Sequence, residues 1–535
     1  MNGAAINGVH GQSYEAWHRH LGRNKALRPR ALRRTLTIGT LASAAERSLA
    51  ARAMKPLLSV DRDVATGADL LKGSDAVVDV LRASCSIHGR RVLLSMPNSI
   101  DFAIAYLGVL RAGCSAVVTN PALTRPELER LIAAGEVVAA LVSPAVADTL
   151  ALSGPAYRIG ASSQLIVLET DLTPAGAQAP PTPRPSDEAV LAHTSGSTGE
   201  PKGVPLSHAN LLASMRAAMT SWRWSPDDVV LHSLPLYHQH GLGSIHALFL
   251  GGGRTTILSH FDPEQLASRV QSEQATVLLG VPATYRRLLE ADPGREQFAS
   301  LRLAVSGSAP LPPAMFAEIA AVLGLPPLER YGMTESGLDI SNLYEGPRSP
   351  GSVGYPLPGV EAVVVDSDGE TELPAGSDGE ILLRGPQVFS GYLGGWDPDA
   401  ISSEGWLHTG DIGRVDPHDG SISITGRLKD VIISGGLNIY PREVEVVLER
   451  HPDVAAVAVG GVISERWGEV VCAMVVPRPG TRPRRDDLVA MCDTTLARYK
   501  HPKYFFLVPE LPRNDMGKVL RSALAPLAES GVPLD

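Results

Sequence analysis

The chain has 535 residues, more than one hydrophobic core usually organises, so at least two domains are expected. Its composition, 44% hydrophobic and 20% charged, is typical of an ordinary globular protein. A net charge of -9 provides no basic field, which argues against a nucleic-acid partner or attachment to an anionic membrane surface.

The cysteines and apolar runs bear on the cellular setting. Cys85, Cys114, Cys472 and Cys492 are far apart and lack metal-ligand spacing, which is typical of inert thiols in a reducing compartment. No uncharged apolar stretch approaches the length of a membrane span, and the N-terminus lacks the apolar core of a signal peptide. We therefore expect a cytoplasmic protein with no membrane span.

The first 34 residues differ from the rest of the chain. Seven arginines and lysines lie between Arg19 and Arg34, with little apolar periodicity around them. This pattern predicts a solvated or partly disordered extension, and the alternative is an amphipathic targeting or docking element.

From Thr35 onward, short β-branched runs alternate with helix-like stretches. Strands are predicted at 91–96, 276–281 and 301–307, and a helix at 101–113. The proline-rich segment 173–188 interrupts this order and is expected to arch over the surface. The alternation predicts an α/β fold with parallel-rich sheets.

The last hundred residues have shorter units. A helix is predicted from Pro441, with Val444, Val447 and Leu448 on one face, followed by strands at 454–459 and 470–476. We expect a small α+β domain here. The predicted division is a basic extension at 1–34, a large domain at 35–428 and a small domain at 429–535.

Residues 193–208, "HTSGSTGEPKGVPLSH", lie between a predicted strand at 189–192 and a helix that begins at Ser207. In such a loop glycines can turn backbone N–H groups toward an anion, hydroxyls donate hydrogen bonds, and Lys202 supplies positive charge. It is not a Walker A loop, because no glycine precedes Lys202 and no Ser or Thr follows it. The segment predicts a phosphate-binding loop, and the alternative is a mobile linker.

Four later segments carry polar residues of similar character: "RYGMTESG" (330–337), "GWLHTGDIGRVD" (405–416), "GRLKDVIISGGLNIYPREVE" (426–445) and "PRNDMGKVLR" (512–521). Taken singly, Tyr331 is explained by packing, Asp411 by a turn and Lys518 by surface charge. Together with the Lys202 loop, in this order and spacing, the segments closely resemble the adenylate-forming superfamily over residues 35–535. The likeness is nearest to the malonyl-CoA synthetase branch, on "LPLYHQHGLG" (234–243), "LLGVPATYRRLL" (278–289) and "SGSAPL" (306–311).

The resemblance implies a two-step reaction. A carboxylate attacks the α-phosphate of ATP to give an acyl-AMP and pyrophosphate, and a thiol, usually that of coenzyme A, then displaces AMP. It also implies Mg²⁺ on the phosphates, with Glu335 as the protein ligand. The resemblance assigns the nucleotide to Thr194, Ser195, Gly196, Ser197, Thr198, Gly199 and Lys202 at the phosphates, Tyr331, Gly332 and Met333 at adenine, Thr334 at the α-phosphate, Asp411 at the ribose, and Arg427 at ribose or phosphate.

The resemblance also implies a moving small domain. Lys518 would bridge the attacking carboxylate and the α-phosphate, and the domain would pivot at Lys429 between the two half-reactions. After rotation, Gly435 and Gly436 would line the pantetheine tunnel, where a side chain would block the passing chain.

The acid pocket is implied less fully. His238 matches a pocket position, Gly307, Ser308 and Ala309 match the loop between acid and adenine, and Arg287 matches an arginine that holds a distal carboxylate. Asp339 stands where malonyl enzymes carry asparagine, so a monocarboxylic or amino-substituted acid is expected instead of malonate. His240 and His246 are compatible with either the pocket or core packing.

Two alternatives to an acid–CoA ligase stay open at this point. In the first alternative, the chain is an adenylating enzyme whose acceptor is a carrier-protein thiol, an amine or a small inorganic nucleophile instead of coenzyme A. In the second, the chain is a catalytically silent adenylate-binding protein.

Overall fold

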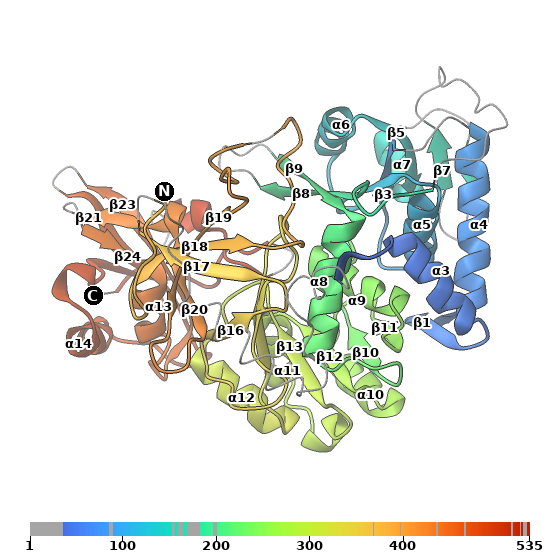
Figure 1. Ribbon diagram of the computed structural model, residues 1–535. Coiled ribbons are helices and arrows are strands. Elements are labelled where there is room, and N and C mark those ends of the chain that lie inside the picture. Colours follow the sequence, from blue (N-terminus) through green and yellow to red (C-terminus); the bar gives the residue numbers. More distant parts are fainter. Residues whose placement is uncertain are drawn as a thin grey trace.

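The computed structural model describes residues 36–84, 89–151, 156–158, 164–167, 182–195, 201–366, 369–395, 397–434, 437–464, 467–514, 517–524, 526–527 and 532–534. The predicted basic extension, the loop residues Gly196 to Gly199, and Gly435 with Gly436 lie outside these ranges. In Figure 1 the N-terminal blue elements lie on the right and the C-terminal orange and red elements on the left.

The first layer is a seven-stranded sheet of order β6-β7-β5-β3-β4-β8-β9. Strands β3, β4, β5 and β8 pair in parallel, as the alternation of strand and helix signals predicts. The strands and helices of this part are α3 (Leu41–Ala51), α4 (Gly67–Ser84), β3 (Arg91–Ser95), α5 (Ile100–Arg111), β4 (Ser115–Val118), α6 (Arg125–Ala134), β5 (Val137–Val142), α7 (Pro144–Leu150), β6 (Ala156–Arg158), β7 (Gln164–Val167), β8 (Glu188–Ser195), β9 (Pro201–Ser207) and α8 (His208–Ser221).

A 13-stranded sheet forms the centre of the molecule. Its order is β17-β18-β19-β20-β16-β15-β14-β13-β12-β10-β11-β1-β2. Its elements are β1 (Pro56–Val60), β2 (Asp63–Thr66), β10 (Val229–His232), α9 (Gln239–Phe249), β11 (Arg254–Ile257), α10 (Pro263–Glu273), β12 (Val277–Gly280), α11 (Pro282–Glu290), η2 (Arg295–Phe298), β13 (Leu303–Ser306), α12 (Pro313–Leu323), β14 (Leu328–Tyr331), β15 (Ile340–Ser341), β16 (Ser352–Pro356), β17 (Glu361–Val365), β18 (Asp378–Arg384), β19 (Leu407–Val415) and β20 (Ile422–Arg427).

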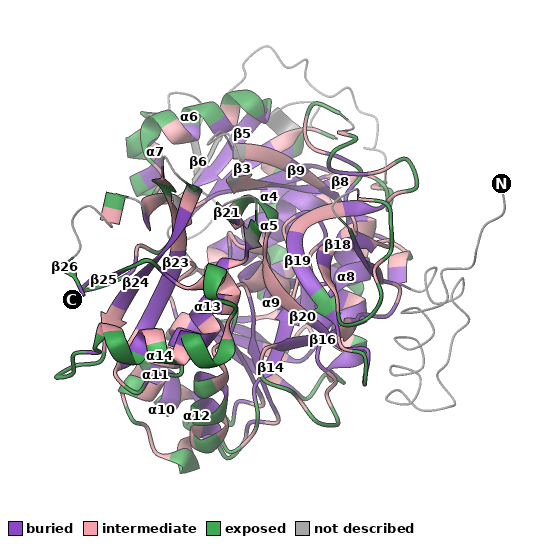
Figure 2. Ribbon diagram, turned by 90° about the vertical axis from the view of Figure 1, so that its left-hand side faces the viewer, coloured by how far each residue is buried: buried purple, intermediate pink, exposed green. Residues whose placement is uncertain are grey.

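This central sheet changes character at β14. Strands β10 to β14 and β1 with β11 pair in parallel, whereas β14 to β20 pair antiparallel. Figure 2 shows the strands mostly buried and the outer faces of α10 and α12 exposed, as expected for helices that cover a sheet.

The C-terminal elements form a third, six-stranded sheet. They are η3 (Leu428–Asp430), β21 (Ile432–Ser434), β22 (Leu437–Ile439), α13 (Pro441–Leu448), β23 (Val454–Ser464), β24 (Gly468–Pro477), α14 (Arg485–Thr495), η4 (Arg498–Lys500), β25 (Tyr504–Leu507), η5 (Arg521–Ala523) and β26 (Val532–Pro533). Val444, Val447 and Leu448 of α13 are buried in the core of this unit. The predicted fold class, a large α/β unit followed by a small α+β unit, is confirmed.

One local prediction was wrong. The lysine loop does not connect a strand directly to a helix, because residues 201–207 form β9, which pairs antiparallel with β8 and brings Thr194 opposite Lys202. Val204 and Leu206 are buried while Pro205 and Ser207 are less so, which is the alternation of a half-buried strand. Ser207 then caps α8 by accepting from the N–H of Asn210.

Two smaller findings bear on the cellular setting. Cys114, Cys472 and Cys492 are buried, and none of the three forms a disulfide within the described part of the chain. Of the helices that the structure describes, none has the length and apolar character needed to cross a membrane. The cytoplasmic location stays a prediction.

Candidate active site

The first cluster of polar side chains lies where the small domain meets the central sheet. Asp411 on β19 is buried, and its two carboxylate oxygens contact Tyr331 Oη at 2.7 Å and Arg427 Nε at 2.8 Å. Because β19 pairs with β20 at Asp411 and Arg427, the backbone register itself sets this ion pair. Burial, reinforced by Asp411, holds the pKa of Tyr331 well above its usual range.

Lys518 reaches the same cluster from the C-terminal domain. The loop that carries it is closed by Asn514, whose side-chain oxygen accepts from the N–H of Lys518 at 2.9 Å. Burial and, to a smaller extent, the neighbouring Arg427 lower the pKa of Lys518 to about 8, and Asp411 opposes this shift. The structure therefore brings Lys518, Arg427, Asp411 and Tyr331 together from distant parts of the sequence.

A second cluster joins the lysine loop to Glu335. Lys202 Nζ lies 4.6 Å from the ring centre of Tyr392 and 3.8 Å from Asp397 Oδ2. Tyr392 Oη donates to Glu335 Oε1 at 2.9 Å. Burial raises the pKa of Glu335, and hydrogen bonds from its own backbone N–H and from Tyr392 oppose that rise.

The loop from Tyr331 to Glu335 is tightly folded. A Cβ on Gly332 would lie 1.9 Å from the carbonyl oxygen of Gly337, so this position requires glycine. The N–H of Gly337 donates to Met333 O at 2.7 Å. Thr334, between them, is partly exposed on the same loop as the buried Glu335.

The loop after β13 is equally constrained. A Cβ on Gly307 would lie 2.3 Å from Arg330 Nε, and Ser308 has a φ of 69°, in the left-handed region. Ala309 follows and is partly exposed. The close approach of Arg330 explains why glycine stands at 307.

Beside this loop lies an internal cavity with about 620 Å³ of empty space, part of it open to solvent. Its apolar wall includes Leu211, Met215, Trp222, Trp224 and Leu279.

Several buried polar atoms of the cavity wall lack a hydrogen-bond partner within the described residues. They are Gln239 Nε2, both ring nitrogens of His240, Arg330 Nε and Gln387 Oε1. Burial without a partner is costly for such groups, so these atoms are available to hydrogen-bond a ligand or water in the cavity.

The four residues that were predicted to bind the acid lie at different positions relative to the cavity. They are His238, Gly307, Arg287 and Asp339. Gly307 lies against Arg330, which lines the cavity, and His238 precedes α9, with its ring 4.8 Å from that of Tyr237. Arg287 lies apart from the cavity: it is exposed on α11, 4.6 Å from the ring centre of Phe261, because Tyr285 and Leu288 occupy the buried face of that helix.

Asp339 is buried but lies behind the cavity wall. It accepts from Ser336 Oγ at 2.6 Å and from Gln387 Nε2 at 3.0 Å, and both donors line the cavity. Burial raises the pKa of Asp339 to about 6. Its influence on a ligand would therefore pass through Gln387.

His240 and His246 both line the cavity. His246 also bonds to Tyr106 Oη at 2.8 Å, so it serves core packing as well. Lys429 is exposed in η3, between the central sheet and β21. The side chain of Ser195 and all of Gly196 to Gly199 lie outside what the structure describes.

Sequence reasoning missed several residues of these clusters. They are Tyr392, Asp397, Gln239, Gln387, Arg330 and the two tryptophans. Tyr392 stands in a glycine-flanked turn, "SGYLGG", which could have marked it as a functional loop. Arg330 adjoins Tyr331 in a segment already singled out, but its direction depends on the tertiary fold.

Comparison with known proteins agrees with this geometry. The AMP-binding enzyme family matches residues 43–393, and the AMP-binding enzyme C-terminal domain matches residues 443–518. The chain belongs to the AMP-binding enzyme family. It is an AMP-forming acid–thiol ligase of the acyl-CoA synthetase type, which uses ATP and acts on a carboxylic acid.

Three relatives illustrate the likeness. An oxalate–CoA ligase of Arabidopsis thaliana is 35% identical over 455 residues, covering 82% of this chain and 88% of the relative. A mitochondrial malonate–CoA ligase of Bos taurus is 34% identical over 484 residues, covering 82% and 81%. The crystal structure of ATP-bound MatB from Rhodopseudomonas palustris is 34% identical, with a TM-score of 0.78, covering 91% of this chain and 98% of that one. The predicted malonyl-CoA synthetase-like branch is confirmed.

Proposed function

We propose that the chain joins a carboxylic acid that carries an amino or hydroxyl substituent to coenzyme A, through an acyl-AMP held between the two domains. The observation that carries this proposal is the meeting of Lys518, from the small domain, with Arg427, Asp411 and Tyr331 of the large one. These groups come from four separate segments and serve no evident packing purpose as a set.

The nucleotide roles follow from the two clusters. Asp411 and Tyr331 offer an acceptor and an aromatic face to ribose and adenine, and Arg427 offers a guanidinium to ribose or phosphate. Thr194 and Lys202, on facing strands, begin and end the loop that would embrace the β- and γ-phosphates. Ser195 to Gly199 complete that loop by their place in the sequence.

Magnesium is part of the proposal. The described residues contain no group of three or more His, Cys, Asp or Glu side chains that could hold a metal alone. Glu335 fits Mg²⁺, which is often bound by one carboxylate together with substrate phosphates, and Tyr392 fixes the orientation of that carboxylate. The bound ion would supply charge neutralisation at the phosphates.

Lys518 would act during adenylation. A carboxylate that approaches a polyanion needs positive charge at the point of attack, and Lys518 offers it from a mostly buried position where electrostatic effects are strong. Thr334 would donate to the α-phosphate from the neighbouring loop. His238, Gly307, Ser308 and Ala309 would border the acid beside it.

The cavity supports the choice of acid. Its apolar wall suits a hydrocarbon or aromatic body, and Gln387 Oε1 can accept from an amino or hydroxyl group. Arg330 and Gln239 can donate to a hydroxyl or carbonyl oxygen. Asp339 favours such a donor indirectly, because it fixes the Gln387 amide.

The test is mass spectrometry of quenched reactions with ATP, Mg²⁺ and a panel of malonic, short fatty, benzoic, hydroxybenzoic and aminobenzoic acids, with and without coenzyme A. We expect an acyl-CoA product, greatest for a hydroxy- or amino-substituted acid. An acyl-AMP that accumulates unchanged after coenzyme A is added would contradict the acceptor, and preference for malonate would contradict the acid.

A further inference from the structure

The indole of Trp224 lies between two hollows of the molecule. One is the internal cavity described above, and the other is a surface groove with Arg47, Arg216, Met219 and Leu250 in its wall, here called the rear groove. Trp224 lines both hollows, and no other residue does so within the described part of the chain. It therefore forms a partition between them.

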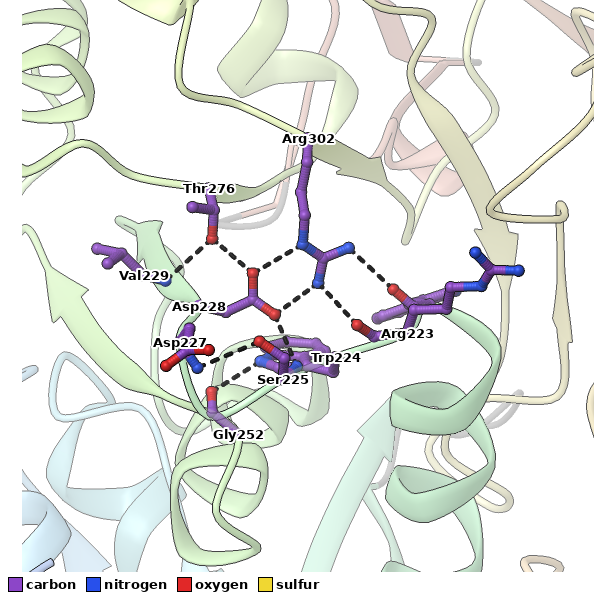
Figure 3. A network of polar contacts seen from close by, with 10 residues as sticks. Arg223, Trp224, Ser225, Asp227, Asp228, Val229, Gly252, Thr276 and Arg302 are labelled. Carbon is purple, nitrogen blue, oxygen red and sulfur yellow. Dashed lines mark hydrogen bonds and ion pairs between the residues drawn. The ribbon is translucent and has the colours of Figure 1, made fainter. Parts of the chain in front are cut away.

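The partition is held firmly. Trp224 Nε1 donates to Gly252 O at 2.8 Å, and the ring lies 5.9 Å from that of Trp222 in a stacked arrangement. A buried carboxylate stabilises the turn that follows, since Asp228 accepts from the N–H of Ser225 at 2.7 Å. Figure 3 shows the Trp224–Gly252 and Ser225–Asp228 hydrogen bonds around the turn from Arg223 to Asp228.

Arg302, which immediately precedes β13, also holds this turn in place. It contacts Asp228 through Nε at 2.7 Å and Nη2 at 2.6 Å, a bidentate pair (Figure 3). It also donates to Trp222 O at 3.0 Å and Arg223 O at 3.2 Å. An aromatic wall with both its ring and its backbone fixed is suited to exclude a ligand rather than to yield to it.

We propose that Trp224 is a specificity-determining residue that sets the length of the acid which the enzyme accepts. The inference rests on the proposed assignment of the internal cavity to the acid. An acid that fits in front of the indole is bound, whereas a longer one meets the ring. Without the indole, the cavity would continue into the rear groove, where Arg47 and Arg216 favour a polar or anionic end.

Gly243 provides an opposing change at another position of the cavity wall. It lies in α9 and lines the cavity, and a Cβ built there meets no atom within 4 Å. A leucine at this position would fill part of the cavity and is a good helix former. Met219 provides the matched control, because it lines the rear groove and not the cavity.

The experiment measures kcat/KM for straight-chain and ω-carboxylated acids of increasing length with four variants: Trp224→Ala, Trp224→Leu, Met219→Ala and Gly243→Leu. Thermal unfolding of each variant identifies those that are folded, and Trp224→Leu serves if the alanine variant is not. We expect the Trp224 variants to accept longer acids, with about a fourfold gain for each further methylene buried. We expect Met219→Ala to keep the wild-type dependence of kcat/KM on acid length, and Gly243→Leu to shift the preference toward shorter acids.

An unchanged length profile in folded Trp224 variants, while Gly243→Leu shortens the profile, would overturn the inference and leave the proposed acid site intact. A profile that neither Trp224 nor Gly243 variants move would instead contradict the assignment of the cavity to the acid, and with it the inference.

Discussion

At the residue scale, the proposed adenylation step depends most on the charge of Lys518. Burial and the neighbouring Arg427 place its pKa at about 8, below that of an ordinary lysine. The protonated amine is the form that can stabilise the developing charge, and that form is lost as the pH rises through 8. We expect the rate of ATP–pyrophosphate exchange in the presence of the carboxylic acid substrate to fall over the same pH range.

Two substitutions test the effect of the Lys518 charge separately from that of the loop that carries it. Lys518→Arg keeps a cation at all accessible pH values and should remove the alkaline fall, at some cost in rate from altered geometry. Lys518→Ala should lower the exchange rate by about 10²-fold or more at pH 7. If the exchange rate of the Lys518→Arg variant still falls at alkaline pH, a group other than Lys518 causes the fall.

At the element scale, helix α11 of the large domain is the docking surface for the Lys518 loop. A Cβ on Gly517 would lie 2.6 Å from that of Ala283, so the loop contacts this helix closely. One turn along, Arg286 Nη1 donates to Ala455 O of the small domain at 3.4 Å. Both contacts are present in the arrangement in which Lys518 meets Arg427 and Asp411.

Enlarging this contact should affect the two half-reactions unequally. We expect Ala283→Leu to slow adenylation about tenfold more than it slows thioester formation from preformed acyl-AMP, because only the first step needs Lys518 in place. Arg287→Ala is the control, since Arg287 is exposed on the same helix and its guanidinium lies over the ring of Phe261. Equal slowing of both steps by Ala283→Leu would indicate general damage to the fold.

The elements also show what the sequence could and could not predict. Strong periodicity and clear flanks identified α5, β12, β13 and α13. Strand β9 was missed because Pro201, Gly203 and Pro205 mask the alternation of Val204 and Leu206. The family resemblance implied that Lys518 and Asp411 face one nucleotide. The cavity wall was not predictable, because Trp224, Arg330 and Gln387 share no local pattern.

At the scale of the whole molecule, the site depends on two domains in one particular arrangement. The large domain holds the Lys202 loop, the cluster of Tyr331, Asp411 and Arg427, and the cavity, and the small one brings Lys518. Rotation about Lys429 stays a prediction, as do the roles of Gly435 and Gly436.

Transfer of an oxygen isotope from the acid to AMP tests the acyl-AMP intermediate most directly. The acid is supplied with ¹⁸O in its carboxylate, together with ATP, Mg²⁺ and coenzyme A, and AMP and pyrophosphate are analysed by mass spectrometry. The account predicts one ¹⁸O atom in AMP and none in pyrophosphate, because the attacking carboxylate oxygen stays on the α-phosphate when the thiol displaces AMP. Unlabelled AMP, or label in a released phosphate, would contradict an acyl-AMP in this site.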